Sequence, residues 1–105
     1  MIQMTEETRN DWRVVKVVGR ADSEAAADLE ATLRAAVEGH ARVVADFTAL
    51  IYISSAGLRA VLQAARAAQK RGSEFAICGL TEFVRKVFDT SGLNQVLSIR
   101  GELPC

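Results

Sequence analysis

One short stretch near the middle of the chain carries the residue types that could do chemistry. It reads Tyr52, Ile53, Ser54, Ser55, Ala56, Gly57 and Leu58. Ser54 and Ser55 stand where an apolar segment gives way to a helical pattern, and either hydroxyl can cap that helix by accepting a backbone N–H of its first turn. Either hydroxyl can also carry a phosphate, because the free N–H groups and positive dipole end of a helix N-terminus stabilise negative charge. The residues alone leave open plain helix capping and a phosphorylation site.

A phosphate in this stretch would act on binding and leave the fold in place. It would add about −1.5 to −2 charges to a surface that otherwise shows small residues. A partner whose facing surface is apolar or acidic would then be expelled. Gly57 is a second signal, since a glycine inside the first helical turn costs about 1 kcal/mol relative to alanine. It indicates that a partner chain or a neighbouring loop approaches the helix backbone closely.

The same serines do not form a recognisable catalytic group. Their surroundings do not match the Gly-x-Ser-x-Gly pattern of a nucleophile elbow. His40 is the single histidine, follows Gly39, and has no spacing that supports a Ser-His-Asp triad. One histidine and two cysteines do not supply a convincing metal site, and neither common glycine-rich phosphate loop is present. We therefore expect no enzyme and no cofactor.

Charge and length restrict the class of protein further. The chain has 105 residues with 13 basic and 13 acidic side chains, so its formal net charge is zero. This balance argues against a general partner among nucleic acids or anionic membranes, which would need a basic surface. Residues 1–7 lack the features of a signal peptide, and the apolar runs are far shorter than the ~20 residues that span a bilayer. We expect one cytoplasmic domain over residues 1–105.

The elements that must position the serine stretch can be read from the hydrophobic pattern. Residues 12–18 are rich in β-branched side chains and predict a strand, and the weaker candidate 2–8 could pair with it as an edge hairpin across 9–11. Further strands are predicted at 42–47, 74–78 and 96–99. Residues 48–53 are predicted to be a mostly apolar connection that leads to the serines.

Three helices are predicted between these strands. Asp22 or Ser23 can cap the first, which Gly39 ends and whose apolar face is Ala26, Leu29, Leu33, Ala36 and Val37. The second runs over about 55–71 and stops at Gly72. Thr81 can cap the third, which stops at Gly92 and is predicted to turn Phe83, Val84, Val87 and Phe88 inward.

One face of the second helix is hydrophilic. It carries Arg59, Gln63, Arg66 and Lys70. This stripe is interpreted as a solvated helix face, with a docking surface for an acidic partner as the alternative.

The resulting order is β-β-α-β-α-β-α-β, which predicts an α/β fold with a mostly parallel sheet, an N-terminal edge hairpin and helices packed on the sheet. Functional loops of such sheets lie at the carboxyl ends of the strands. The predicted connection before Ser55 occupies that position. The fold prediction and the chemistry therefore point to the same end of the sheet.

Three segments together resemble the STAS domain family. They are residues 43–47 (VVADF), 51–58 (IYISSAGL) and the second half, 73–97, especially 83–93 (FVRKVFDTSGL). The similarity covers nearly the whole chain and implies a single STAS-like domain. We expect no attached transporter or sensor domain, which makes the stand-alone anti-sigma factor antagonist the most similar class.

The resemblance implies partner switching. The unphosphorylated chain would bind an anti-sigma factor that is also a serine kinase of the histidine-kinase-like ATPase type. The kinase would phosphorylate and release it, and a PP2C-like phosphatase would reset it. ATP and magnesium would belong to the kinase. Apart from the resemblance, a monomer is the default expectation for the free chain, and the sequence leaves its oligomeric state open.

The family motif maps onto this chain residue by residue. It reads Asp-Ser, then Ser or Thr, then Gly-Leu, and its phosphorylated serine aligns with Ser55. Ser54 stands in place of the aspartate and is the second choice of acceptor, while Ala56 replaces the other hydroxyl. The partner-binding residues that the resemblance implies are Tyr52, Ser54, Ser55, Ala56, Gly57, Leu58 and Arg59. The alternative is a non-phosphorylated STAS scaffold, such as an accessory subunit of a transporter or of a stressosome-like assembly.

Overall fold

The computed structural model describes residues 2–92 and 98–99. Its elements are β1 (Ile2–Arg9), β2 (Trp12–Ala21), α1 (Ala26–Gly39), β3 (Arg42–Ile53), α2 (Ser55–Arg71), β4 (Glu74–Cys78), α3 (Glu82–Ser91) and β5 (Ser98–Ile99). The predicted order of strands and helices is confirmed. The last strand falls within the predicted 96–99, of which 96–97 lie outside the described residues.

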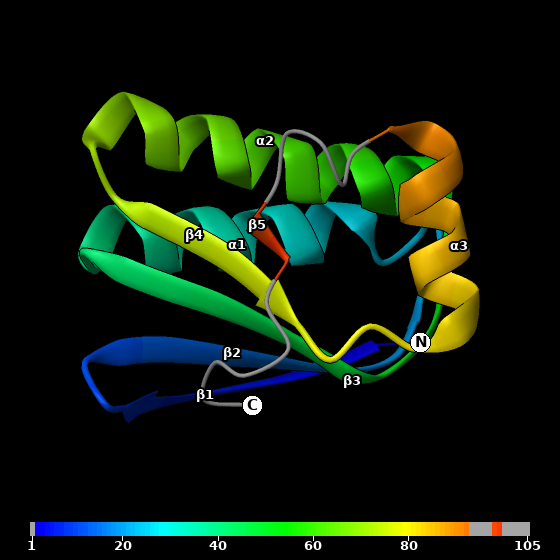
Figure 1. Ribbon diagram of the computed structural model, residues 1–105, viewed down its shortest axis with the longest axis horizontal. Helices are drawn as coiled ribbons and strands as arrows, with labels where there is room; N and C mark the ends of the chain where they lie inside the picture. The colour runs from blue at the N-terminus through cyan, green and yellow to red at the C-terminus, as the bar shows by residue number, and fades with distance from the viewer. Residues whose placement is uncertain (1, 93–97, 100–105) are drawn as a thin grey trace.

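The described strands form one sheet in the order β1-β2-β3-β4-β5 (Figure 1). β1 runs antiparallel to β2, and the other neighbours are parallel. Asn10 and Asp11 turn the β1–β2 hairpin with φ of +52° and +70°. A two-residue hairpin turn of type I′ needs positive φ at both central residues, and Asn and Asp tolerate it better than most. The predicted edge hairpin is thereby confirmed.

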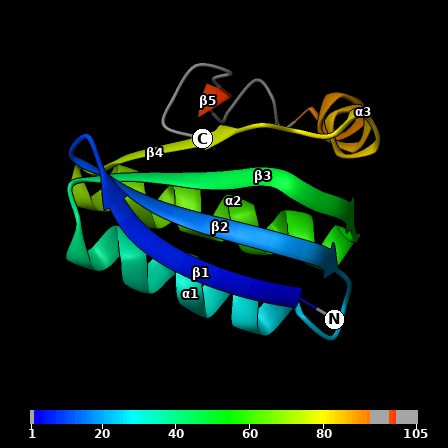
Figure 2. The ribbon, with the colours of Figure 1, turned by 90° about the horizontal axis from the view of Figure 1, so that it is seen from below.

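Two helices cover one face of the sheet. Figure 2 shows α1 and α2 running along the same side of the sheet, behind the strands in that view. Leu29, Leu33 and Val37 of α1 are fully buried, as is Val61 of α2. α3 stands apart from this pair, at the end of the sheet where β3 and β4 finish and α2 begins (Figure 1). The chain therefore brings the start of α2 and the start of α3 to the same end of the molecule.

The predicted connection over 48–53 is wrong, because these residues are strand. β2 and β3 stay paired as far as Ala21 opposite Ile53. The run is rich in Leu, Ile and Tyr, which suits a strand, but two register shifts break its alternation and hide the pattern. The connection to α2 shrinks to the single residue Ser54.

The predicted cap of α1 is also wrong. The helix begins at Ala26, and its N-cap residue Ala25 offers no side-chain hydrogen bond. Asp22 acts one turn earlier, where its Oδ1 accepts a hydrogen bond from the Ala25 backbone N–H at 3.0 Å. This backbone hydrogen bond lowers the pKa of the Asp22 carboxyl below its usual range. Asp22 therefore shapes the turn before the helix.

Candidate functional site

The junction between β3 and α2 is held by the hydroxyl of Ser54. Ser54 is the N-cap of α2 and accepts a hydrogen bond from the Gly57 N–H at 3.1 Å. The same hydroxyl donates to the carbonyl of Ala21 at 3.0 Å, and the Ser54 N–H donates to that carbonyl at 2.9 Å. Both bonding roles of this hydroxyl are thus used to fix the helix start to the end of β2.

The Ser55 hydroxyl takes no part in holding the junction between β3 and α2. Ser55 is the first residue of α2 and is exposed, and its hydroxyl makes no hydrogen bond to any of the described residues. The first turn of α2 has no acidic residue, while Lys70 and Arg71 stand in the last turn. An anion on Ser55 would lie beside the backbone N–H groups of the first helical turn and the positive end of the helix dipole, and both would stabilise it.

The two serines are expected to differ in what they contribute to stability. Ser54→Ala should lower the free energy of unfolding by about 1–2 kcal/mol, because it removes the cap and the bond to Ala21. Ser55→Ala is the matched control and should change it by less than about 0.5 kcal/mol. Urea unfolding of the three chains measures both. Equal losses in the two variants would show that Ser54 does not hold the junction.

Gly57 is buried, and the structure shows which part of the protein lies closest to its backbone. A Cβ at this position would lie 2.8 Å from the Ala21 carbonyl oxygen and 2.8 Å from Cγ1 of Ile53. The close neighbours are therefore β2 and β3 of the same chain. Little of Gly57 is exposed to a partner, and its role in partner binding stays a prediction.

Gly57→Ala is expected to lower the free energy of unfolding by about 1–3 kcal/mol, because the added methyl overlaps with backbone that cannot move easily. Gly39→Ala is the matched control, since nothing lies within 4 Å of a Cβ there. That variant should be neutral or slightly stabilising, by up to about 1 kcal/mol. Thermal unfolding of both variants tests this, and a Gly57→Ala chain as stable as wild type would contradict the crowding.

The other residues named for partner binding differ in exposure. Arg59 is exposed one turn beyond Ser55, and Ala56 and Tyr52 are half-buried. Leu58 is half-buried and packs against the core. Of the residues predicted to bind a partner, Ser55 and Arg59 are therefore the exposed ones, Gly57 is buried, and the others are half-buried.

The prediction that Phe83 points inward is wrong. Its side chain is 49% exposed, while Val84 and Phe88 on the same helix are fully buried. The helix rests on the row formed by Val84 and Phe88, four residues apart, and this leaves Phe83 on its flank. There Phe83 stacks on Tyr52 of β3, with ring centroids 5.8 Å apart and an interplanar angle of 23°.

Two more residues lie at this end of the molecule that the sequence does not indicate as candidate site residues. The guanidinium of Arg20 lies 4.4 Å from the centre of the Tyr52 ring, within range of a cation–π interaction. Ile51 is 58% exposed, although it belongs to an apolar run that reads as core. No spacing rule joins residues 20, 51 and 83, so only their placement in the fold reveals them.

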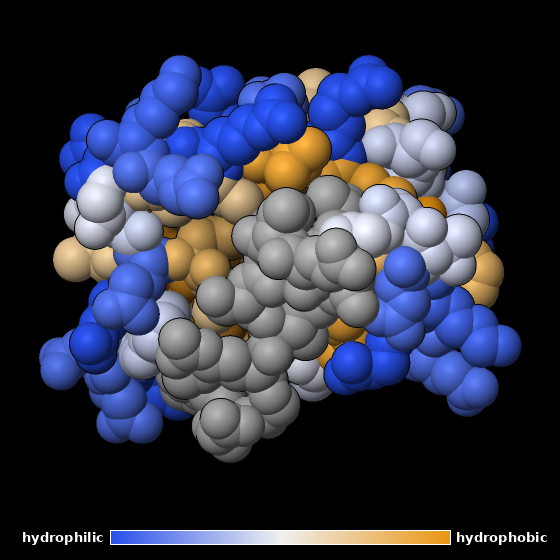
Figure 3. Space-filling view, turned by 45° about the horizontal axis from the view of Figure 1, so that its top comes forward, coloured by the Kyte–Doolittle hydropathy of each residue, from blue (hydrophilic) through white to orange (hydrophobic). Residues whose placement is uncertain are grey.

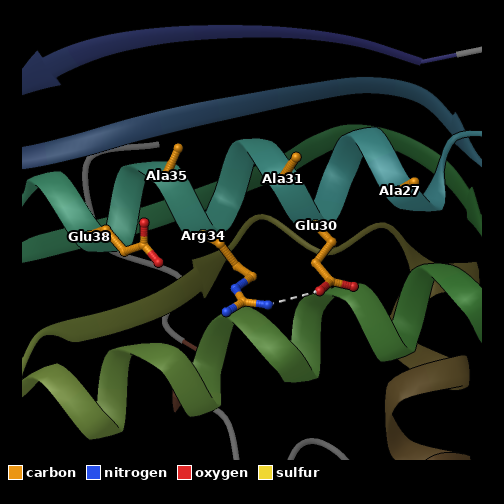
Figure 4. A pocket seen from close by; sticks show the side chains of 6 residues that line it. All are labelled: Ala27, Glu30, Ala31, Arg34, Ala35 and Glu38. Atoms are coloured by element: carbon orange, nitrogen blue, oxygen red, sulfur yellow. Dashed lines mark hydrogen bonds and ion pairs between the residues drawn. The ribbon is translucent and has the colours of Figure 1, made fainter.

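A pocket elsewhere on the molecule contains fewer groups that could take part in a reaction or bind a ligand. It lies along α1 and is lined by Ala27, Glu30, Ala31, Arg34, Ala35 and Glu38 (Figure 4). All six residues come from one helix, and Arg34 is already paired with Glu30 at 3.2 Å. The hollow brings together no catalytic combination of groups.

Catalytic and metal chemistry find no further support in the fold. α1, which His40 follows, ends on the opposite side of the molecule from the start of α2 (Figure 1). Within residues 2–92 and 98–99, no group of three or more His, Cys, Asp or Glu side chains could hold a metal ion. No helix in that part of the chain is long and apolar enough to cross a membrane.

Comparison with known proteins places this arrangement in a class. A family model described as Mlab, STAS domain, matches residues 4–101. A crystal structure of an anti-sigma factor antagonist from Mycobacterium paratuberculosis superposes with a TM-score of 0.87 at 23% identity, over 98% of this chain and 88% of that one. SpoIIAA of Bacillus in its phosphorylated form superposes with a TM-score of 0.70 at 22% identity, over 95% and 93% of the two chains. The fold is that of a STAS domain.

A protein with a similar sequence shows which kind of STAS domain this chain resembles. BtrV from Bordetella bronchiseptica, which is named as an anti-sigma factor antagonist, is 43% identical over 82 residues, or 77% of this chain and 71% of BtrV. The chain belongs to the STAS-domain family of anti-sigma factor antagonists.

Proposed function

We propose that this chain is an anti-sigma factor antagonist that works as a partner switch controlled by phosphorylation of Ser55. Unphosphorylated, it binds an anti-sigma factor that is also a serine kinase of the histidine-kinase-like ATPase type. Phosphorylated, it is released, and a PP2C-like phosphatase restores it. The chain is a ligand and a substrate in this cycle, and its partners carry the catalytic groups.

The observation that carries the proposal is the division of roles between the two serines. The Ser54 hydroxyl is half-buried and engaged on both sides, by Gly57 and by Ala21. The Ser55 hydroxyl is exposed at the helix start. A kinase can reach Ser55 without opening the fold, whereas Ser54 would have to give up the cap of α2. This difference in accessibility supports Ser55 as the acceptor.

The transfer itself requires little of this chain. The Ser55 Oγ attacks the γ-phosphorus of the kinase's ATP, the bond from that phosphorus to the β-bridging oxygen breaks, and ADP leaves. The hydroxyl proton passes to a base on the kinase. The phosphatase reverses the modification by attack of water on phosphorus, which returns the Ser55 hydroxyl and inorganic phosphate. The helix dipole at the start of α2 stabilises the phosphorylated product.

Two relatives support the proposal. BtrV carries the name of an anti-sigma factor antagonist, and SpoIIAA has been solved in a phosphorylated form that retains the fold found here. Ser54 replaces an acidic residue of the family motif and still caps the helix, so the loss of the acid leaves the acceptor in place.

The test is intact mass and peptide mapping after incubation with source-cell lysate and Mg-ATP. Wild type and Ser54→Ala should each gain one phosphate, and Ser55→Ala should gain none. A phosphate that persists in Ser55→Ala and vanishes in Ser54→Ala would reassign the acceptor. No phosphate on any chain, in a lysate that labels a control antagonist, would favour the non-phosphorylated STAS scaffold instead.

A further inference from the structure

The carbonyl oxygen of Ala21, the last residue of β2, is the atom to which the start of α2 is attached. It accepts hydrogen bonds from the backbone N–H of Ser54 at 2.9 Å and from the hydroxyl of Ser54 at 3.0 Å. Ala21 is fully buried, and a Cβ at Gly57 would lie 2.8 Å from the same oxygen. The first turn of α2 is therefore packed against this oxygen at two positions, residues 54 and 57.

An irregularity in the sheet brings the Ala21 carbonyl to this place. The pairing of β2 with β3 skips Ile51, which makes it the extra residue of a β-bulge. A bulge bends its strand and shifts the register beyond it. After the bulge, Ala21 lies opposite Ile53, the residue before Ser54. The bulge therefore sets the register in which the Ser54 side chain reaches the end of β2.

The Ser54 hydroxyl bonds in two directions at this junction. It donates to the Ala21 carbonyl, a hydrogen bond that we name the tether, and it accepts from the Gly57 N–H at 3.1 Å. An ionised carboxylate at this position could accept from Gly57 but could not donate, and its charge would face a carbonyl oxygen. The tether therefore depends on a hydroxyl, and the aspartate of the family motif could not supply it in its ionised form.

The rest of α2 does little to fix the direction of Ser55. The buried side chains of the helix begin at Ala60, more than one turn beyond Ser55, and continue with Val61 and Ala68. Leu58, in between, is half-buried against the core. Figure 3 shows hydrophilic side chains along the top of the molecule, where α2 lies, so the helix packs on its inner side. The direction of Ser55 therefore depends on how the helix start is fixed.

We propose that Ser54 is the positioning residue for phosphoryl transfer to Ser55, an inference that rests on the proposed function. In that step the bond from the Ser55 Oγ to the γ-phosphorus forms, the bond from phosphorus to the ADP oxygen breaks, and the hydroxyl proton passes to a base on the kinase. Phosphoryl transfer depends mainly on in-line positioning of the attacking oxygen. The tether to Ala21 supplies this positioning, because without it the first turn of α2 frays and Ser55 spends less time in the reactive orientation.

The test is the single-turnover rate of transfer with the purified kinase that labels Ser55 in the mass experiment. Ser54→Thr and Ser54→Val have the same shape and differ in the hydroxyl, and threonine is also a good N-cap residue. The rate at saturating kinase should be about tenfold or more lower in Ser54→Val than in Ser54→Thr. The kinase concentration at half-saturation should differ by less than about threefold. Ser54→Ala should be slow in the same way and still reach one phosphate, because the tether changes the rate and not the end point.

Val37→Ala is the matched control for lost stability. Val37 is fully buried near the end of α1, on the opposite side of the molecule from the start of α2 (Figure 1). The variant should unfold at a lower urea concentration and transfer phosphate at the wild-type rate. Equal slowing in Val37→Ala and Ser54→Val would mean that lost stability accounts for the effect, and the inference would be overturned.

The outcomes separate this inference from the proposed function. If no kinase labels wild type at Ser55, the proposed function fails and the inference fails with it. If wild type is labelled and Ser54→Val transfers as fast as Ser54→Thr, the inference is overturned and the proposed function stands. A difference confined to the half-saturating concentration, with equal rates at saturation, would place the hydroxyl in the contact with the kinase. That result would also overturn the inference.

Discussion

Replacing Ser55 by aspartate should leave the fold intact and weaken binding to the anti-sigma factor by about a hundredfold or more. Ser55 is exposed at the first position of α2, so a carboxylate there meets no neighbour that must move. A negative charge in the first helical turn interacts favourably with the helix dipole, by about 0.3–1 kcal/mol. The variant should therefore be as stable as wild type or slightly more stable. The lost affinity then comes from repulsion at the interface.

The measurement is a titration of the purified kinase with wild type and Ser55→Asp, by calorimetry. Two matched controls separate charge at this site from other effects. Ser55→Asn has the size of the aspartate without its charge and should lose much less affinity. Gln69→Glu adds the same charge at an exposed position near the far end of α2 and should bind like wild type. A Ser55→Asp chain that binds as tightly as wild type would exclude a charge switch at this residue.

Most of the fold follows from local signals in the sequence. The end of α2 is an example, because Gly72 adopts a φ of +74° and its N–H reaches the carbonyls of Ala68 and Gln69. A glycine after two basic residues predicts such a helix end from chemistry within one turn. The Asn10-Asp11 turn is equally local. Local signals predicted both of these features, although the equally local cap of α1 was predicted wrongly.

The candidate site was predictable only in part, because its decisive contacts are distant in the chain. The sequence shows two serines before a helix, but Ala21, 33 residues earlier, decides that Ser54 is the one held in place. The exposure of Phe83 likewise depends on how α3 rotates against β3, and apolar periodicity does not fix that rotation. The bulge at Ile51 depends on the pairing with β2. Each of these features belongs to tertiary packing.

Phe88→Ala is expected to give the largest loss of stability, about 3–5 kcal/mol. Phe88 is fully buried and packs edge-to-face on Phe47, which is itself fully buried in β3. Removing the ring leaves a cavity between α3 and the sheet and ends the aromatic contact. The loss is a large part of the 5–15 kcal/mol that holds a typical domain together. Urea unfolding at constant m value measures it.

Phe83→Ala is the matched control on the same helix. Its ring is half exposed, so truncation should cost only about 1 kcal/mol, mostly from the stack with Tyr52. Phe88→Ala should therefore lose much more stability than Phe83→Ala. Equal destabilisation by both would mean that Phe83 supports the fold. A much smaller loss in Phe83→Ala would show that the buried ring of Phe88, packed on Phe47, is what holds α3 to the sheet.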